Sequence, residues 1–484
     1  MSNERGGDGG VKKSGPSTRV NRRDFLQQAG MTSVALAAGA GVSSQILAQG
    51  LPRPGVADWR RFGYDLHNTR FNVRETVLGP DNVSRLKLKW TFQAEAQIQT
   101  TPTVIGDTLF FGAHDGYQYA LESATGKLKW KFKAPGEANR VRSSCQYVDG
   151  RIYFGDNDTT VHCLDAAQGR EIWKTTISDP KNHIFCSVAV HDGKVVVGYS
   201  SPSESGEIVC LDAETGAVRW RFPVVREARY GGGSVWTSPA IDEEAGVVYN
   251  VTGSLKAVVA STGPVLYTES ILAHDLDSGE LLWYHQARPS DPFDLDFGCH
   301  PMIVDAVAPA GYRGRAVRQC VIAGNKAGIF SFNRYTGERY WKVMLTKAAP
   351  RGGPLLNSTA IAYNRVYLVN NAINPKGDIS VSVALNAYNG DIEWWTPNEA
   401  VTWGPVAVAN GVFYQGLADN SLEALDAEEG RSLWKYQLPT LHRGGIAIAN
   451  GALYTSNGAP MTGWTPEQVR SHDYLVHAFT VDGV

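Results

Sequence analysis

A glycine followed four residues later by a tryptophan recurs seven times along this chain and strongly limits what it can fold into. In one copy, an apolar run at 207–211 leads into Asp-Ala-Glu-Thr-Gly at 212–216, and Trp220 follows. This order predicts a strand, a tight turn and a second strand, because glycine accepts the positive φ of such a turn. The pairs are Gly126 and Trp130, Gly169 and Trp173, Gly216 and Trp220, Gly279 and Trp283, Gly337 and Trp341, Gly390 and Trp394, and Gly430 and Trp434.

The tryptophans of successive repeats are separated by the length of one propeller blade. The separation runs from 40 residues, between Trp90 and Trp130, to 63 residues, between Trp220 and Trp283. This is the period of a four-stranded blade with connecting loops of different lengths. The tryptophan in the strand after each turn can lay its ring across the neighbouring blade.

The two ends of the repeat region are complementary fragments of one more blade. Residues 473–483 carry the strand and turn without the tryptophan strand, and residues 85–90 carry a tryptophan strand with no turn before it. Joining them predicts an all-β, eight-bladed β-propeller over residues 49–484, with the ring closed by pairing of the N- and C-terminal strands. A stack of two β-sandwiches would not explain the complementary ends. Residues 58–70, polar and aromatic, are expected to pack over one end of the ring.

Residues 1–48 precede the repeats and have the form of a twin-arginine export signal. Arg22 and Arg23 lead into an apolar run of small residues, and cleavage is expected after Ala48. An arginine pair before an amphipathic helix is the alternative. The apolar run is too short and too rich in glycine to span a membrane stably. We therefore expect export in the folded state to the periplasm or out of the cell, without stable membrane insertion.

Charge and cysteine content exclude several classes of protein. The formal net charge is −2, with acidic and basic residues interspersed, so no nucleic-acid footprint or polybasic patch is expected. Of the six cysteines, Cys163 and Cys210 occupy equivalent positions in successive blades, which indicates small core residues. The chain contains no Cys-x-x-Cys-His, so covalent c-type haem on this chain is excluded.

Blades with docked tryptophans and Asp-Ala-x-x-Gly turns resemble the pyrroloquinoline quinone (PQQ)-dependent alcohol dehydrogenases, over residues 58–484. The same repeat occurs in non-catalytic BamB-type outer-membrane assembly lipoproteins, so the loops must separate the two. Residues 231–236, Gly-Gly-Gly-Ser-Val-Trp, are similar to the fourth-blade motif of the dehydrogenases. The resemblance implies that Trp236 is the floor on which PQQ stacks, since a flat indole suits a planar cofactor. A core tryptophan is the alternative.

Four residues match positions where the resemblance implies a metal ion. Ser254 stands where the family has a metal-binding asparagine, and Glu204 matches the family's acidic ligand. Within residues 289–297, Asp294 aligns with the catalytic base and Asp296 with the additional carboxylate of lanthanide-using members. A solvated acidic loop is the alternative for Asp294 and Asp296. Together these oxygens would suit Ca²⁺ or a lanthanide, although a serine hydroxyl is a weaker ligand than an amide carbonyl.

PQQ carries three carboxylates, so the resemblance also implies cationic and polar partners. Lys326 matches the residue beside the quinone carbonyls, and Arg142 matches a carboxylate-binding arginine. Gln99 falls where many members have an acid, and Arg443 is a further candidate anion contact or a surface arginine. Where the alcohol dehydrogenases carry two adjacent cysteines, residues 143–145 read Ser-Ser-Cys, so the disulfide ring over the cofactor is absent.

The resemblance thus implies a periplasmic quinoprotein dehydrogenase that oxidises an alcohol to a ketone or aldehyde. The metal would polarise the quinone C5 carbonyl with the help of Lys326, Asp294 would take the alcohol proton, and hydride would pass to C5. Electrons would leave to a separate periplasmic acceptor such as cytochrome c. Residues 351–354 and the entry segment look closer to polyvinyl-alcohol dehydrogenases than to methanol enzymes, which favours a secondary or bulky alcohol. The alternatives are a BamB-like binding protein, disfavoured by the lack of a lipobox cysteine, and a propeller lyase or hydrolase that uses the carboxylates without PQQ.

Overall fold

The computed structural model describes residues 55–484 with gaps. The gaps are residues 137–138, 202–203, 227–230, 256–264, 289–290, 292–293, 313–315, 346–354, 356–357, 372–379 and 459–472. Contacts within the chain group Gly50–Val484 into one unit. The export signal at residues 1–48 and the glycine-rich residues 351–354 lie outside the described residues, so their interpretation stays a prediction.

Eight sheets of antiparallel strands follow one another along the chain, each running from an inner to an outer strand. The first four are β3 (Thr103–Ile105), β4 (Thr108–Gly112), β5 (Tyr117–Glu122) and β6 (Leu128–Lys133); β7 (Gln146–Val148), β8 (Arg151–Gly155), β9 (Thr160–Asp165) and β10 (Glu171–Thr176); β11 (Ala189–His191), β12 (Lys194–Tyr199), β13 (Glu207–Asp212) and β14 (Val218–Pro223); and β15 (Ala240–Asp242), β16 (Val247–Val251), β17 (Ser270–Asp275) and β18 (Leu281–Gln286).

The remaining four sheets complete the set. They are β19 (Met302–Val307), β20 (Val317–Asn325), β21 (Gly328–Asn333) and β22 (Arg339–Met344); β23 (Ala360–Ala362), β24 (Arg365–Asn370), β25 (Ser380–Asn386) and β26 (Ile392–Asn398); β27 (Ala407–Ala409), β28 (Val412–Gly416), β29 (Ser421–Asp426) and β30 (Ser432–Gln437), with the short β1 (Phe71–Asn72) parallel to β27; and β31 (Ala447–Ala449), β32 (Ala452–Ser456), β33 (Tyr474–Val481) and β2 (Leu86–Ala94), the last preceded by the 3-10 helix η1 (Val83–Arg85).

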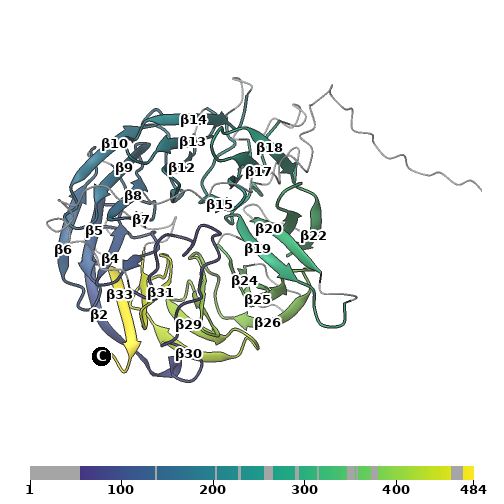
Figure 1. The fold of residues 1–484 in the computed structure, drawn as a ribbon. Coiled ribbons are helices and arrows are strands. Elements are labelled where there is room, and N and C mark those ends of the chain that lie inside the picture. The colour runs from purple at the N-terminus through teal and green to yellow at the C-terminus, as the bar shows by residue number, and fades with distance from the viewer. Residues whose placement is uncertain are drawn as a thin grey trace, which may run out of the picture. The chain divides into compact units, whose positions relative to one another are not determined.

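The ring closes where the two ends of the chain meet. The inner strands contact one another in chain order from β3 to β31, and β31 contacts β3. In the last sheet, β2 pairs antiparallel with β33, with Trp90 opposite Ala478. Figure 1 shows the yellow β33 beside the purple β2. The eight-bladed propeller closed by its N- and C-terminal strands is therefore confirmed.

Each repeat tryptophan docks onto the next blade, which explains the constant glycine-to-tryptophan spacing. The repeat glycines pass directly beneath the rings: a Cβ added to Gly126, whose φ is +72°, would lie 2.6 Å from the Trp90 ring. Only glycine fits both this approach and this backbone conformation. Each indole Nε1–H donates to a backbone carbonyl of the following blade at 3.0–3.2 Å, the pairs being Trp90 and Ser123, Trp130 and Ala166, Trp173 and Ala213, Trp220 and Leu276, Trp283 and Arg334, Trp341 and Ala387, Trp394 and Ala427, and Trp434 and Leu86.

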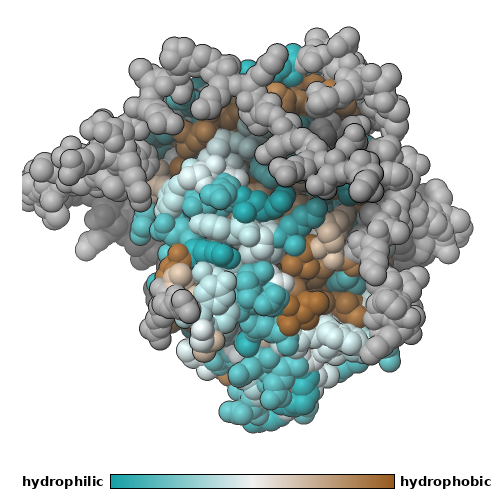
Figure 2. Space-filling view, turned by 90° about the vertical axis from the view of Figure 1, so that its right-hand side faces the viewer, coloured by the Kyte–Doolittle hydropathy of each residue, from teal (hydrophilic) through white to brown (hydrophobic). Residues whose placement is uncertain are grey.

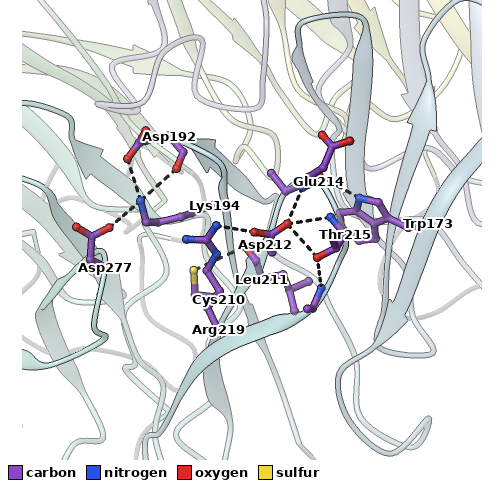
Figure 3. A network of polar contacts seen from close by, with 12 residues as sticks. Trp173, Asp192, Lys194, Cys210, Leu211, Asp212, Glu214, Thr215, Arg219 and Asp277 are labelled. Atoms are coloured by element: carbon purple, nitrogen blue, oxygen red, sulfur yellow. Dashed lines mark hydrogen bonds and ion pairs between the residues drawn. The ribbon is translucent and has the colours of Figure 1, made fainter. Parts of the chain in front are cut away.

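The aspartate of the repeat turn holds the backbone, as Figure 3 shows for one blade. The Asp212 carboxylate accepts the backbone N–H groups of Glu214 and Thr215 at 3.0 and 2.9 Å. This is the Asx arrangement that makes aspartate favourable in tight turns. Lys194 adds a link between blades, because its Nζ lies 2.7 Å from Asp277 of the next blade. The aspartates of the repeat turns therefore stabilise the turns and the contacts between blades. Acidic residues with a functional role are expected in the loops.

Replacing Trp434 by phenylalanine tests the docking that closes the ring. The variant loses the 3.1 Å hydrogen bond to the Leu86 carbonyl, and we expect the free energy of unfolding to fall by about 1–2 kcal/mol. The matched control is Trp395→Phe, because that side chain is 44% exposed; its change should stay within about 0.5 kcal/mol. Urea denaturation measures both. Equal losses in the two variants would contradict the closing role of Trp434.

Residues 59–72, which we call the inner segment, bind the inner strands of the ring. Inner strands leave one row of N–H and C=O groups without a neighbouring strand, and a buried backbone group needs a partner. The Asn72 side chain donates to the Ile448 carbonyl of β31 at 2.7 Å. Backbone hydrogen bonds reach six more inner strands, joining Trp59 to Val104, Arg60 to Tyr147, Leu66 to Ile241, His67 to Ile303, Thr69 to Ile361 and Arg70 to Val408.

The six cysteines are buried and free. Cys163 and Cys210 are fully buried core residues, as the sequence predicts. Burial raises the pKa of the Cys163 thiol to about 11 and that of Cys210 to about 12, so both stay protonated and unreactive in the folded protein. No disulfide covers the candidate cavity described below, because Ser143 and Ser144 precede Cys145.

The outer surface of the unit is mainly polar. On the side that Figure 2 shows, hydrophilic and intermediate residues cover most of the coloured surface, and the hydrophobic residues form smaller groups. Elsewhere on the ring, the outer strand β6 has three lysines that alternate with apolar residues. Within the described ranges, no helix is both long and apolar enough to cross a membrane.

Candidate active site

A cavity of about 700 Å³ opens where the chain enters the inner strands. Ser144 precedes β7, Ser187 precedes β11 and Ser238 precedes β15, and all three line the cavity. Their hydroxyls also tie neighbouring blades together: Ser187 Oγ accepts the Ser144 N–H, and Ser238 Oγ accepts the Ser187 N–H, both at 2.9 Å. Six predicted site residues line this one cavity, namely Gln99, Arg142, Trp236, Asp296, Lys326 and Arg443.

A lysine that lines the cavity lies between two carboxylates. Lys326 Nζ lies 2.5 Å from Asp296 Oδ1 and 3.2 Å from Asp294 Oδ2. Trp236 Nε1 donates to the other oxygen of Asp296 at 2.8 Å. The side chains of Lys326 and Asp296 are each 9% exposed, whereas that of Asp294 is 59% exposed. The predicted floor, lysine and acids thus meet at one place, where Asp296 lines the cavity and Asp294 contacts Lys326 without being a lining residue.

A local turn brings the two acids together. Asp294 has a φ of +59°, in the left-handed region, so residues 294–296 do not follow a simple extended path. The backbone N–H of Lys326 donates to the Asp296 carbonyl at 3.0 Å, and Phe297 bridges to Asn325 at the end of β20. These bonds fix the acidic segment against the β20–β21 turn. This turn, and not the alternation of an extended strand, therefore sets the directions of the two acidic side chains.

Burial and ion pairing shift the pKa values of Asp296 and Lys326 in opposite directions. Burial raises the pKa of Asp296, although the Lys326 ammonium counteracts it. Burial disfavours the charge of Lys326, but Asp296 and Asp294 together raise its pKa above the usual value. Lys326 is therefore charged throughout the physiological range and offers a fixed positive group at the cavity wall.

Three arginines also line the cavity, namely Arg140, Arg142 and Arg443. Burial, together with the nearby Arg140 and Arg443, lowers the pKa of Arg142 to about 10. Burial also lowers the pKa of Arg443 to about 10, and the pKa of His114 falls well below its usual value through burial and these three arginines. The buried Nε of Arg142 has no hydrogen-bond partner in the described part of the chain. Gln99 Oε1 lies 3.2 Å from the ring of His114.

Motif matching missed Arg140, His114 and Phe185, which all line the cavity. The Phe185 ring packs under Arg142, with the guanidinium carbon 4.9 Å from the ring centroid. Arg140 could have been found from its place two residues before Arg142, since both side chains of an extended segment at i and i+2 share a face. His114 and Phe185 come from other blades, and the local sequence around them carries no comparable signal.

The predicted metal ligands are only partly gathered. The Ser254 hydroxyl donates to Glu269 Oε1 at 2.6 Å, and burial raises the pKa of Glu269 to about 9, with Asp296 and Asp291 adding to the shift. Glu204 is exposed, and no contact joins its carboxylate to Ser254 or Asp296 in the described residues. Across the same residues, no three or more His, Cys, Asp or Glu side chains are arranged to hold a metal. The metal roles of Glu204, Ser254, Asp294 and Asp296 stay predictions.

Two family models match different parts of the chain. The model described as outer membrane protein assembly factor BamB matches residues 84–184 and 325–458. The model described as glucose/ethanol/alcohol dehydrogenase, beta-propeller domain, matches residues 182–355, the stretch that holds Trp236, Asp296 and Lys326. The chain is a propeller similar to the PQQ-dependent alcohol dehydrogenases.

Individual relatives and solved structures show the same similarity. A polyvinylalcohol dehydrogenase from Pseudomonas sp. is 26% identical, over 88% of this chain and 77% of the relative. The crystal structure of the quinohemoprotein alcohol dehydrogenase from Comamonas testosteroni superposes with a TM-score of 0.75 at 20% identity, over 88% of this chain and 81% of that one. A europium-containing methanol dehydrogenase superposes with a TM-score of 0.76 at 17% identity, over 88% and 98%. The two solved structures establish the shared fold.

Proposed function

We propose that this quinoprotein alcohol dehydrogenase-like chain oxidises an alcohol to a ketone or aldehyde with PQQ and a Ca²⁺ or lanthanide ion. The observation that carries the proposal is one cavity lined by an indole, by Lys326 with Asp296, and by the half-buried Arg142 and Arg443. A cavity lined by an aromatic side chain and a few convergent polar groups is typical of a cofactor site.

The cavity residues fit the chemistry of PQQ. A planar cofactor needs a flat wall, and Trp236 is half-buried with part of its ring facing the cavity. Three carboxylates need cations, and the neighbouring Arg142, Arg140 and Arg443 line the cavity. The unpartnered Nε of Arg142 is a donor that an anion would satisfy.

The protein's own groups would position the alcohol and take its proton. When bound, PQQ would supply the acceptor for the two electrons and the hydrogen that leave the alcohol carbon. Asp294 is our proposed base, because its carboxylate lies 3.2 Å from Lys326 Nζ and, at 59% exposure, can reach an alcohol entering from solvent. Lys326 would hold Asp294 and Asp296 in place and present its positive charge to a carbonyl oxygen.

Substrate, acceptor and location belong to the same proposal. The polyvinylalcohol dehydrogenase among the relatives supports a secondary or polymeric alcohol. With no c-type haem motif on this chain, a separate acceptor such as cytochrome c would remove the electrons. The arginine pair at residues 22–23 supports export to the periplasm. A BamB-like binding protein is the competing function, and the BamB model covers blades on both sides of the site.

Arg142→Gln tests the cofactor site directly. We expect PQQ, titrated with Ca²⁺ present and followed by quenching of tryptophan fluorescence, to bind at least about tenfold more weakly, because charged hydrogen bonds contribute about 1.5–3 kcal/mol. The control is Arg219→Gln on outer strand β14, where the arginine pairs with Asp212 and is 39% exposed; it should bind PQQ as the wild type does.

Dye reduction with primary, secondary and polymeric alcohols completes the test. Turnover that depends on PQQ and on the metal supports the dehydrogenase. Wild-type protein that binds no PQQ and reduces no dye with any alcohol would contradict the proposal and favour the BamB-like binding protein.

A further inference from the structure

Glu269 is a buried carboxylate with one oxygen unsatisfied. It lies directly before β17, is 1% exposed, and its backbone N–H donates to the Gly253 carbonyl at 3.1 Å. The Ser254 hydroxyl donates to Oε1 at 2.6 Å, while Oε2 has no hydrogen-bond partner in the described structure. Burying a carboxylate oxygen without a hydrogen-bond donor or a cation costs free energy. We therefore expect this oxygen to have a partner that the described residues do not supply.

The surroundings of Glu269 are acidic. Ser254 Oγ lies 3.4 Å from Asp291 Oδ2, which also accepts the backbone N–H of Leu295. Asp296 is on the other side of Gly253, where an added Cβ would stand 2.9 Å from Asp296 Oδ2. Glu269 thus shares a small region with two further carboxylates.

The positive charge of Lys326 does not neutralise all the acidic side chains around Glu269. Lys326 lies near Glu269, but its Nζ already forms ion pairs with Asp296 and Asp294. In the described part of the chain, Glu269 and the aspartates at 291, 294 and 296 therefore lie near one lysine. An added cation would relieve both the charge repulsion and the unsatisfied oxygen.

We propose that Glu269, Asp291 and the Ser254 hydroxyl are ligands for the metal ion of this site, an inference that rests on the proposed function. Ser254 stands where the resemblance implies a metal-binding asparagine, and its hydroxyl is a shorter and weaker ligand than an amide carbonyl. Glu269, hydrogen-bonded to that same hydroxyl, supplies the missing oxygen ligand. Two carboxylates and a hydroxyl form a hard, oxygen-only set suited to Ca²⁺ or a lanthanide, and leave positions for water or cofactor oxygens in the shell of about 6–8 ligands.

Terbium binding tests the ligands without quinone or turnover. Tb³⁺ bound near an indole emits when tryptophan is excited, and Trp236 is linked to the group through Asp296. The folded, quinone-free protein is titrated with Tb³⁺, and Ca²⁺ competition confirms the site. For Glu269→Gln, which keeps the side-chain size, we expect the Tb³⁺ dissociation constant to rise at least about tenfold, the loss of one charged ligand being worth about 1.5–3 kcal/mol.

Glu280→Gln is the matched control, because Glu280 is an exposed acid in the turn between β17 and β18 of the same blade. It should bind Tb³⁺ as the wild type does. Asp291→Asn, at a half-exposed position, should also lose affinity and provides the test should Glu269→Gln not fold. Wild-type protein without sensitised Tb³⁺ emission, or unchanged affinity in the folded Glu269→Gln or Asp291→Asn variant, would overturn the proposal.

The two proposals fail separately. Tb³⁺ binding that depends on Glu269 in a protein that binds no PQQ would retain the metal ligands and remove the dehydrogenase. PQQ binding with Tb³⁺ affinity independent of Glu269 would retain the cofactor site and remove Glu269 from the metal.

Discussion

Asp294→Asn should lower kcat with an alcohol substrate by about 10²–10⁴-fold, the usual contribution of a general base. The carboxylate accepts a proton that an amide cannot accept. The change should spare the fold, because Asp294 is 59% exposed and Lys326 keeps its 2.5 Å contact with Asp296. PQQ-loaded protein, a dye acceptor and a series of alcohol concentrations separate kcat from KM.

Asp305→Asn is the control for this experiment. Asp305 is 56% exposed and pairs with Arg334 at 2.8 Å, so it resembles Asp294 in exposure and in having a cationic partner, but it lies in β19 and does not line the cavity. Its kcat should equal that of the wild type. A kcat for Asp294→Asn within threefold of the control would exclude Asp294 as the base, and Asp296, the acid inside the cavity, would take its place.

Arg70→Met should lower the free energy of unfolding by about 3–5 kcal/mol, the usual result of leaving buried polar partners uncompensated. Arg70 is fully buried, and its guanidinium donates to the carbonyls of Phe62, Val406 and Ile446, the last at 3.0 Å. Methionine fills much of the volume but satisfies none of these carbonyls. Because Phe62 lines the candidate cavity, weaker PQQ binding should accompany the loss.

The burial of its positive charge reduces the stability that Arg70 contributes. Burial lowers the pKa of Arg70 to about 9, so the charged guanidinium is less favourable here than in water. The hydrogen bonds and the Phe62 ring, 4.9 Å from the guanidinium carbon, offset that cost. The control is Arg74→Met, an exposed neighbour, with an expected change within about 0.5 kcal/mol in urea denaturation. A loss below 1 kcal/mol for Arg70→Met would contradict its role in joining the inner segment to the ring.

Much of the fold is visible in the sequence because a propeller is built from local units. Each blade repeats one strand–turn–strand pattern, and the Gly126–Trp130 spacing alone indicates which residues of successive blades meet. The complementary fragments around Trp90 and residues 473–483 predict the closing pair, and β2 and β33 confirm it. The paths of the long loops in blades four and five do not follow from the repeat, because they lie outside its period.

Some residues of the candidate site could likewise be predicted from sequence motifs, and others could be found only in the structure. Motif matches led to Trp236, Asp296 and Lys326, which share one cavity, since a motif keeps residue types that a local turn can position. They did not lead to Glu269. That residue becomes conspicuous only when its burial, its unsatisfied oxygen and its bond to Ser254 are seen together.

The sequence by itself determined the blade, the number of blades and the way the ring closes, because these depend on short-range patterns of apolar residues, glycine and tryptophan. The tertiary structure alone decided which side chains share the cavity and how charges are balanced in it. Arg70 and Val406 are 336 residues apart, and the arginines that line the cavity come from separate blades. Burial and electrostatic partners depend on such distant contacts, which no local pattern encodes.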